Sequence, residues 1–217
     1  MGIVASEPGP IPPDRPAGKT AAFDFDGTLT RRDTLLPFLV HVAGRRAVGR
    51  ALAARAGPLA LALGGRGDRG VQKEQVLGRL LAGWPLAELE AVADEFAEAA
   101  VATRLRPEVV GHLRAHLAAG DLVVVVTASP ELVVAPIARR LGPVPVVGTR
   151  LEVGADGRLT GGLLGANVRG AEKVRRLTEW LGDGTLHWAY GDSAGDREML
   201  AAAAVPTWVG RRPSGPR

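Results

Sequence analysis

The chain has 217 residues, 46% of them hydrophobic, which suits one substantial core or a core domain carrying a smaller inserted one. Its net charge is +4, its aromatic content is 4% and it has no long run of like charges, so we expect no nucleic-acid partner. The chain has no cysteine, which excludes disulfides and cysteine-ligated zinc and leaves oxygen or histidine ligands for any metal.

The two ends of the chain are expected to lie outside the folded part. Residues 1–18 are rich in Pro and Gly and lack the cationic and apolar regions of a signal peptide, so we expect a disordered N-terminal tail and a cytoplasmic protein. Residues 211–217 are expected to form a flexible C-terminal tail. We expect no transmembrane segment, while peripheral contact between an amphipathic surface and a membrane stays open.

The elements between these ends follow two patterns. A short apolar run from Thr20 to Phe25 predicts a buried strand that opens into a loop. From Asp33 to about Leu105, apolar residues recur at helical spacing, which predicts an all-helical insertion. After Pro107, helices and strands alternate, which is typical of βαβ units and a parallel sheet. They are a helix through 117, a strand at 122–126, a helix at 131–141, a strand at 144–147, a hairpin at 150–164, a helix at 171–181, a strand at 187–190, a helix at 196–203 and a strand at 206–209.

Two carboxylates follow the first predicted strand, two residues apart, in the run FDFDGT at 23–28. Gly27 lets the chain turn sharply, so that both side chains reach the same loop region. Asp24 can attack phosphorus and form an acyl phosphate, and Asp26 can protonate the leaving oxygen and later activate water. A solvated acidic turn is the alternative interpretation of so short a motif.

A second acidic cluster follows a later predicted strand, in the run GDSAGD at 191–196. Four neighbouring carboxylates repel one another unless a cation lies among them, and oxygen ligands without His or Cys favour Mg²⁺. Asp192 and Asp196 are therefore candidate metal ligands. Asp196 is also a good N-cap for the helix that follows, and the two roles are compatible.

Two further residues could hold a phosphate. Thr127 follows the strand at 122–126, where its hydroxyl and the next backbone N–H groups could bind a phosphate oxygen. Lys173 begins a predicted helix, and its ammonium could meet a phosphoryl oxygen as a point charge. Taken alone, a threonine such as Thr127 is more often an ordinary strand end, and a lysine such as Lys173 is more often an ordinary solvated helix residue.

Together and in this order, these motifs resemble those of the haloacid dehalogenase (HAD) superfamily of phosphatases, subfamily IB, which contains phosphoserine phosphatase. DFDGT at 24–28 is similar to motif I, Thr127 to motif II, Lys173 to motif III and the run at 191–196 to motif IV. The runs VTASPE at 126–131 and DGRLTG at 156–161 strengthen the resemblance, which covers about residues 20–210.

The resemblance implies an α/β fold, with a Rossmann-like three-layer core, a parallel sheet and a small helical C1-type cap inserted after the first strand. The core would comprise residues 19–32 and 106–210, and the cap residues 33–105. It implies Mg²⁺-dependent hydrolysis of a phosphomonoester through an aspartyl phosphate. The implied catalytic residues are Asp24, Asp26, Thr127 and Lys173.

The resemblance also implies ligand-binding roles. Asp24, the backbone carbonyl of Asp26 and Asp192 would bind Mg²⁺, with Asp196 supporting the site. The implied substrate-binding and phosphate-binding residues are Asp26, Gly27, Thr28, Asp33, Thr127, Ala128 and Lys173. Gly195 departs from the family pattern, which usually has Asn before the last motif IV aspartate.

The substrate is the least specific part of the prediction. Asp33 matches an acidic residue that meets the substrate amino group in phosphoserine phosphatases, and it is equally a good N-cap. The family's cap arginine falls near Leu77, and Arg66, Arg69 or Lys73 could replace it.

We therefore expect a small phosphorylated metabolite such as phosphoserine. The alternatives are a phospholipid head group of the phosphatidylglycerophosphate or lysophosphatidate type, phosphotransfer to an alcohol, and a non-catalytic module that binds a phosphorylated ligand. The sequence does not predict the oligomeric state.

Overall fold

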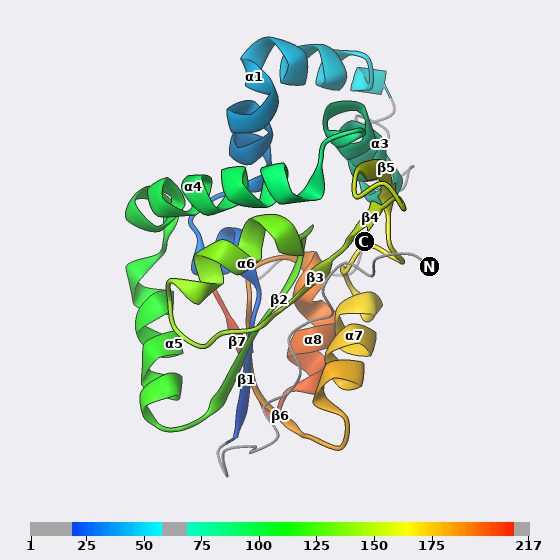
Figure 1. Cartoon of the computed structure of the whole chain (residues 1–217). Helices are drawn as coiled ribbons and strands as arrows, with labels where there is room; N and C mark the ends of the chain where they lie inside the picture. The colour runs from blue at the N-terminus through cyan, green and yellow to red at the C-terminus, as the bar shows by residue number, and fades with distance from the viewer. Residues whose placement is uncertain (1–18, 58–68, 211–217) are drawn as a thin grey trace.

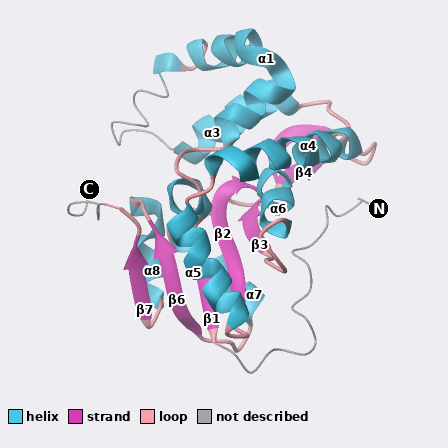
Figure 2. Ribbon diagram, turned by 90° about the vertical axis from the view of Figure 1, so that its left-hand side faces the viewer, coloured by secondary structure: helices cyan, strands magenta, loops and turns pink. Residues whose placement is uncertain are grey.

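A computed structural model describes residues 19–57 and 69–210, and a five-stranded sheet forms its centre (Figures 1 and 2). The strand order is β3-β2-β1-β6-β7, and every neighbouring pair is parallel, which confirms the α/β prediction. The strands are β1 (Thr20–Phe23), β2 (Leu122–Pro130), β3 (Val146–Thr149), β6 (Leu186–Gly191) and β7 (Val205–Trp208).

Helices cover both faces of the sheet because successive strand residues point to opposite sides. In β1, Phe23 packs in the apolar cluster of one face, whereas Ala22 packs in the cluster of the other. The first face is covered by α5 (Pro107–Ala118) and α6 (Glu131–Arg139), and the second by α7 (Ala171–Leu181) and α8 (Arg197–Ala202) (Figure 1).

The segment after β1 forms a helical cap above the carboxyl ends of the strands (Figure 2). Its helices are α1 (Leu35–Ala53), α3 (Arg69–Leu81) and α4 (Leu86–Arg104). A glycine at position 44 bends α1, with a φ of 79° that suits glycine. No described helix is long and apolar enough to cross a membrane.

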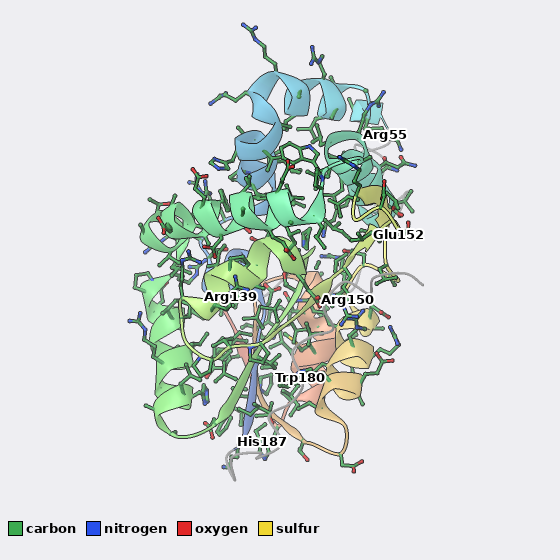
Figure 3. All side chains as sticks on the ribbon, viewed as in Figure 1. Arg55, Arg139, Arg150, Glu152, Trp180 and His187 are labelled. Atoms are coloured by element: carbon green, nitrogen blue, oxygen red, sulfur yellow. The ribbon has the colours of Figure 1, made fainter. Side chains whose placement is uncertain are left out.

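The predicted hairpin forms as β4 (Leu151–Val153) and β5 (Leu159–Leu163), but it packs on the cap helix α3. The approach is so close that a Cβ on Gly78 of α3 would lie 2.8 Å from the carbonyl oxygen of Gly161. On the core side, Arg150 forms an ion pair with Glu131 at 3.3 Å (Arg150 is labelled in Figure 3). The hairpin thus connects cap and core.

Some element ends differ from the prediction. The first strand stops at Phe23, and residues 25–29 form a π-helical turn, so that Asp24 and Asp26 lie beyond the end of the strand. The second strand continues to Pro130, which pairs with Thr149 of β3. The predicted tails, 1–18 and 211–217, lie outside the described residues.

Candidate active site

A pocket of about 200 Å³ lies at the carboxyl ends of β1, β2 and β6, bordered by both core and cap. This is the edge where parallel α/β sheets place ligands. Most of the predicted site residues line it together. The lining residues are Asp24, Asp26, Asp33, Leu35, Lys73, Thr127, Ala128, Ser129, Arg169, Lys173, Ser193, Gly195 and Asp196.

A buried lysine joins two of the predicted aspartates. Lys173 Nζ lies 2.5 Å from Asp24 Oδ1 and 2.6 Å from Asp196 Oδ1. Burial raises the pKa of Asp24 to about 7, although Lys173 opposes this change. Burial would lower the pKa of Lys173, but the two carboxylates outweigh it and raise that pKa. The ammonium therefore stays charged beside the candidate nucleophile.

The carboxylate of Asp26 points to different partners. Its Oδ1 accepts hydrogen bonds from the Thr34 backbone N (2.8 Å) and hydroxyl (2.7 Å), and its Oδ2 accepts one from the Ser129 hydroxyl (2.5 Å). Burial raises the pKa of Asp26 despite these donors. Asp26 is thus held in one orientation and favours the protonated form that a general acid needs.

Three carboxylates form a group that suits a divalent cation. Asp24, Asp192 and Asp196 each offer an oxygen, and these oxygens lie within 4.8 Å of one another. Hard oxygen donors of this kind fit Mg²⁺. A Cβ on Gly27, whose φ is 91°, would overlap the carboxylate of Asp192, so the turn needs glycine there. The Asp26 carboxylate is outside this group. Binding of Mg²⁺ by the backbone carbonyl oxygen of Asp26 stays a prediction.

The predicted phosphate-binding residues divide into two sets. Thr127 and Ala128 line the pocket, and the Thr127 hydroxyl accepts a hydrogen bond from the Ser129 backbone N at 3.0 Å. Gly27 and Thr28 are not among the lining residues. Thr28 is buried, and its hydroxyl donates a long hydrogen bond of 3.5 Å to Asp192 Oδ1. Thr28 therefore helps to orient a member of the acidic cluster and does not face the pocket.

The structure also shows where the candidate substrate-binding residues of the cap lie. Asp33 borders the pocket and accepts a hydrogen bond from the Leu36 backbone N at 2.8 Å, which is the N-cap contact that the sequence suggested. Leu77 of the cap is buried among apolar side chains, whereas Lys73 reaches the pocket. Arg66 and the side chain of Arg69 lie outside the described part of the chain.

Among the site residues that the sequence did not single out are Thr34, Ser129 and Arg169. Ser129 lies in the motif II run, whose polar residues were a signal that could have found it. Thr34 is recognisable only once Asp26 is placed beside it. Arg169 has no motif around it that indicates a role, yet it lines the pocket.

Comparisons with known proteins identify the family of the chain. Residues 21–201 match the family model of haloacid dehalogenase-like hydrolases. The chain is 46% identical over 183 residues to the protein CicA of Caulobacter vibrioides, a match that covers 84% of this chain and 82% of that protein. It is 33% identical over 205 residues to a probable phosphatase of Mycobacterium tuberculosis, covering 88% and 70%.

Solved structures show the same fold. A Bordetella pertussis protein of unknown function has a TM-score of 0.67 and 32% identity, covering 86% of this chain and 87% of that one. A phosphoserine phosphatase with a phospho-aspartyl intermediate analogue has a TM-score of 0.55 at 22% identity, covering 86% and 83%, a likeness of fold. The chain therefore belongs to the haloacid dehalogenase-like hydrolase family and is one of its phosphatases.

Proposed function

We propose that the protein is a Mg²⁺-dependent phosphomonoesterase that forms an aspartyl phosphate on Asp24. The observation that carries the proposal is the separation of two acidic functions in one pocket. Asp24 shares a metal-binding group with Asp192 and Asp196, while Asp26 is held apart by its own donors. A module that only binds phosphorylated ligands does not need this arrangement.

The proposed reaction has two steps. First, a carboxylate oxygen of Asp24 attacks phosphorus, the bond from phosphorus to the alcohol oxygen breaks, and Asp26 gives its proton to that oxygen. In the second step Asp26 accepts a proton from water, the water oxygen attacks the phosphorus, and the bond to Asp24 breaks. The products are the alcohol, inorganic phosphate and the free enzyme.

The other site residues bind and orient the phosphoryl group. Thr127 and the backbone N–H groups after it would hold phosphate oxygens, and Lys173 would supply a fixed positive charge. Mg²⁺ bound by Asp24 and Asp192, with Asp196 in support, would offset negative charge on the phosphoryl group. We also propose that residues 19–32 and 106–210 act as the catalytic core and residues 33–105 as the substrate-selecting cap.

The size of the pocket supports a small substrate such as phosphoserine. Its volume of about 200 Å³ is below the ~300 Å³ at which typical ligand pockets begin, which favours a short metabolite over a phospholipid. One oxygen of Asp33 is occupied by the helix N-cap, which leaves the other for a substrate amino group. Product analysis with an added alcohol would separate hydrolysis from phosphotransfer.

The direct test compares wild type with Asp24→Asn, using p-nitrophenyl phosphate and Mg²⁺. We expect the variant to lose at least about a thousandfold in kcat, because an amide is a poor nucleophile. Asp183→Asn, which removes a carboxylate from an exposed position after α7, is the matched control and should retain wild-type activity. Equal rates for wild type and Asp24→Asn would contradict the proposal.

A further inference from the structure

The second half of α1, beyond its bend, lies at the end of the cap that is farthest from the sheet (Figures 1 and 2). Val48 and Ala51 of this half are buried in the cap. The opposite side forms a basic face, which consists of the exposed residues Arg45, Arg46, Gly49, Arg50 and Ala53. At 3.6 residues per turn, these residues fall within an arc of about 140°. Figure 3 shows nitrogen-tipped side chains that extend from this part of α1 away from the rest of the molecule.

The basic face carries charge that nothing around it balances. From Thr34 to Gly57 the sequence has four arginines and no aspartate or glutamate. Their charge equals the net charge of +4 of the whole chain, so the remaining residues are balanced as a set. Within the described residues, no carboxylate lies within the 4.0 Å of an ion pair to an arginine of the basic face. The fourth arginine, Arg55, instead reaches α3, where its Nη2 donates a hydrogen bond to Gln72 Oε1 at 2.9 Å.

The shape of the basic face indicates what kind of anion fits it. Gly49 and Ala53 lie between the arginines, and a Cβ on Gly49 would meet no atom within 4 Å. The basic face thus has no aromatic side chain to stack on a nucleic-acid base and no large apolar side chain to anchor a protein partner. A convex helix with small residues between its cations can approach a flat anionic surface closely, where charge alone gives attraction.

We propose that the basic face docks the protein onto a membrane surface that contains anionic phospholipids. Each arginine near such a surface strengthens binding by about fivefold, and salt screens this attraction. Docking would place the cap against the membrane and the core away from it. The membrane is here a docking surface and not the substrate, so the inference is independent of the proposed function.

Co-sedimentation with vesicles tests the proposal. We expect wild type to sediment with vesicles that contain phosphatidylcholine and phosphatidylglycerol, but not with vesicles of phosphatidylcholine alone. NaCl at about 1 M, where the screening length is about 3 Å, should release the protein. The triple variant Arg45→Gln/Arg46→Gln/Arg50→Gln should lower the partition coefficient by about a hundredfold. Wild type that stays in the supernatant with both kinds of vesicle would overturn the proposal.

The matched control removes the same charge from other exposed positions. The triple variant Arg79→Gln/Arg114→Gln/Arg139→Gln leaves α1 unchanged, and its partition coefficient should stay close to that of wild type. Equal Tm values for wild type and both triple variants would show that all three proteins fold. An equal loss of binding in the two variants would overturn the proposal, because net charge and not the basic face would then control binding.

A competition experiment separates a membrane from a nucleic acid as the occupant of the basic face. Duplex DNA is added to the vesicles at the same phosphate concentration as the phosphatidylglycerol. We expect more wild-type protein on the vesicles than in the supernatant, because a flat surface meets all three arginines and the basic face offers no group that reads bases. Transfer of most of the protein to the supernatant with the DNA would overturn the proposal.

Discussion

At the scale of single residues, the carboxylate of Asp26 is held in one orientation by its neighbours. Thr34 and Ser129 together give its carboxylate three hydrogen bonds, from the first residues of the cap and from the end of β2. An acid that delivers a proton to a leaving oxygen must be positioned within hydrogen-bond reach of it. Loss of a hydrogen-bond donor to Asp26 should therefore lower kcat/KM most for substrates whose leaving group must be protonated.

We predict that Ser129→Ala lowers kcat/KM for an alkyl phosphate by about tenfold, and by less for p-nitrophenyl phosphate. The reason is that p-nitrophenolate leaves without protonation, whereas an alkoxide does not. Steady-state kinetics with both substrates provides the measurement. Thr103→Ala, which removes an exposed hydroxyl on α4, serves as control. An equal loss for both substrates would indicate that Ser129 acts only on structure.

The aspartates were predictable from the sequence because each follows a strand within a short, dense motif. Lys73 was one of three cap candidates, since helical spacing alone does not show which turn of α3 reaches the pocket. The position of Arg169 in the pocket was not predictable because its neighbour there, Gly195, lies 26 residues later in the chain.

At the scale of elements, the contact between α3 and β5 joins cap and hairpin. Gly78 of α3 and Gly161 of β5 permit it because neither has a side chain to separate the two backbones. We predict that Gly78→Ala lowers the free energy of unfolding by about 1–3 kcal/mol, since its Cβ would press on a backbone oxygen. Chemical denaturation measures this change.

The matched control is Gly49→Ala in α1, where an added Cβ meets no atom within 4 Å. Alanine there should raise the free energy of unfolding by about 0.5–1 kcal/mol through helix propensity. If Gly78→Ala proved equally stabilising, the close contact with the hairpin would be contradicted.

The accuracy of the predicted elements depends on local signals. The helix at 171–181 matches the prediction at both ends because Gly170 and Gly182 adopt positive φ values on either side of it. The hairpin was predicted from its turn residues, but its position on the cap was not. Its partner α3 lies about 80 residues earlier, a separation that local patterns do not encode.

At the scale of the whole molecule, the three converging carboxylates link folding to metal binding. Asp24, Asp192 and Asp196 repel one another in the folded protein, and a bound cation relieves that repulsion. We predict that Mg²⁺ at about 100 times its Kd stabilises the fold by about 2.7 kcal/mol and raises Tm by roughly 5–10 °C. Thermal unfolding with NaCl of equal ionic strength as control provides the measurement. An equal rise in Tm for Asp192→Asn would contradict binding at this site.

The position of the hairpin also changes how many covalent connections join the two halves of the molecule. An inserted cap by itself is joined to the core by two chain segments, which here lead into α1 and out of α4. The hairpin adds two more, from β3 and to α7, so the chain crosses between core and cap four times. A two-stranded hinge can swing widely, whereas four crossings restrict motion to a small rotation in which cap and hairpin turn as one body. We therefore expect substrate access to Asp24 to depend on a short rocking of this body rather than on a lid that moves away from the core.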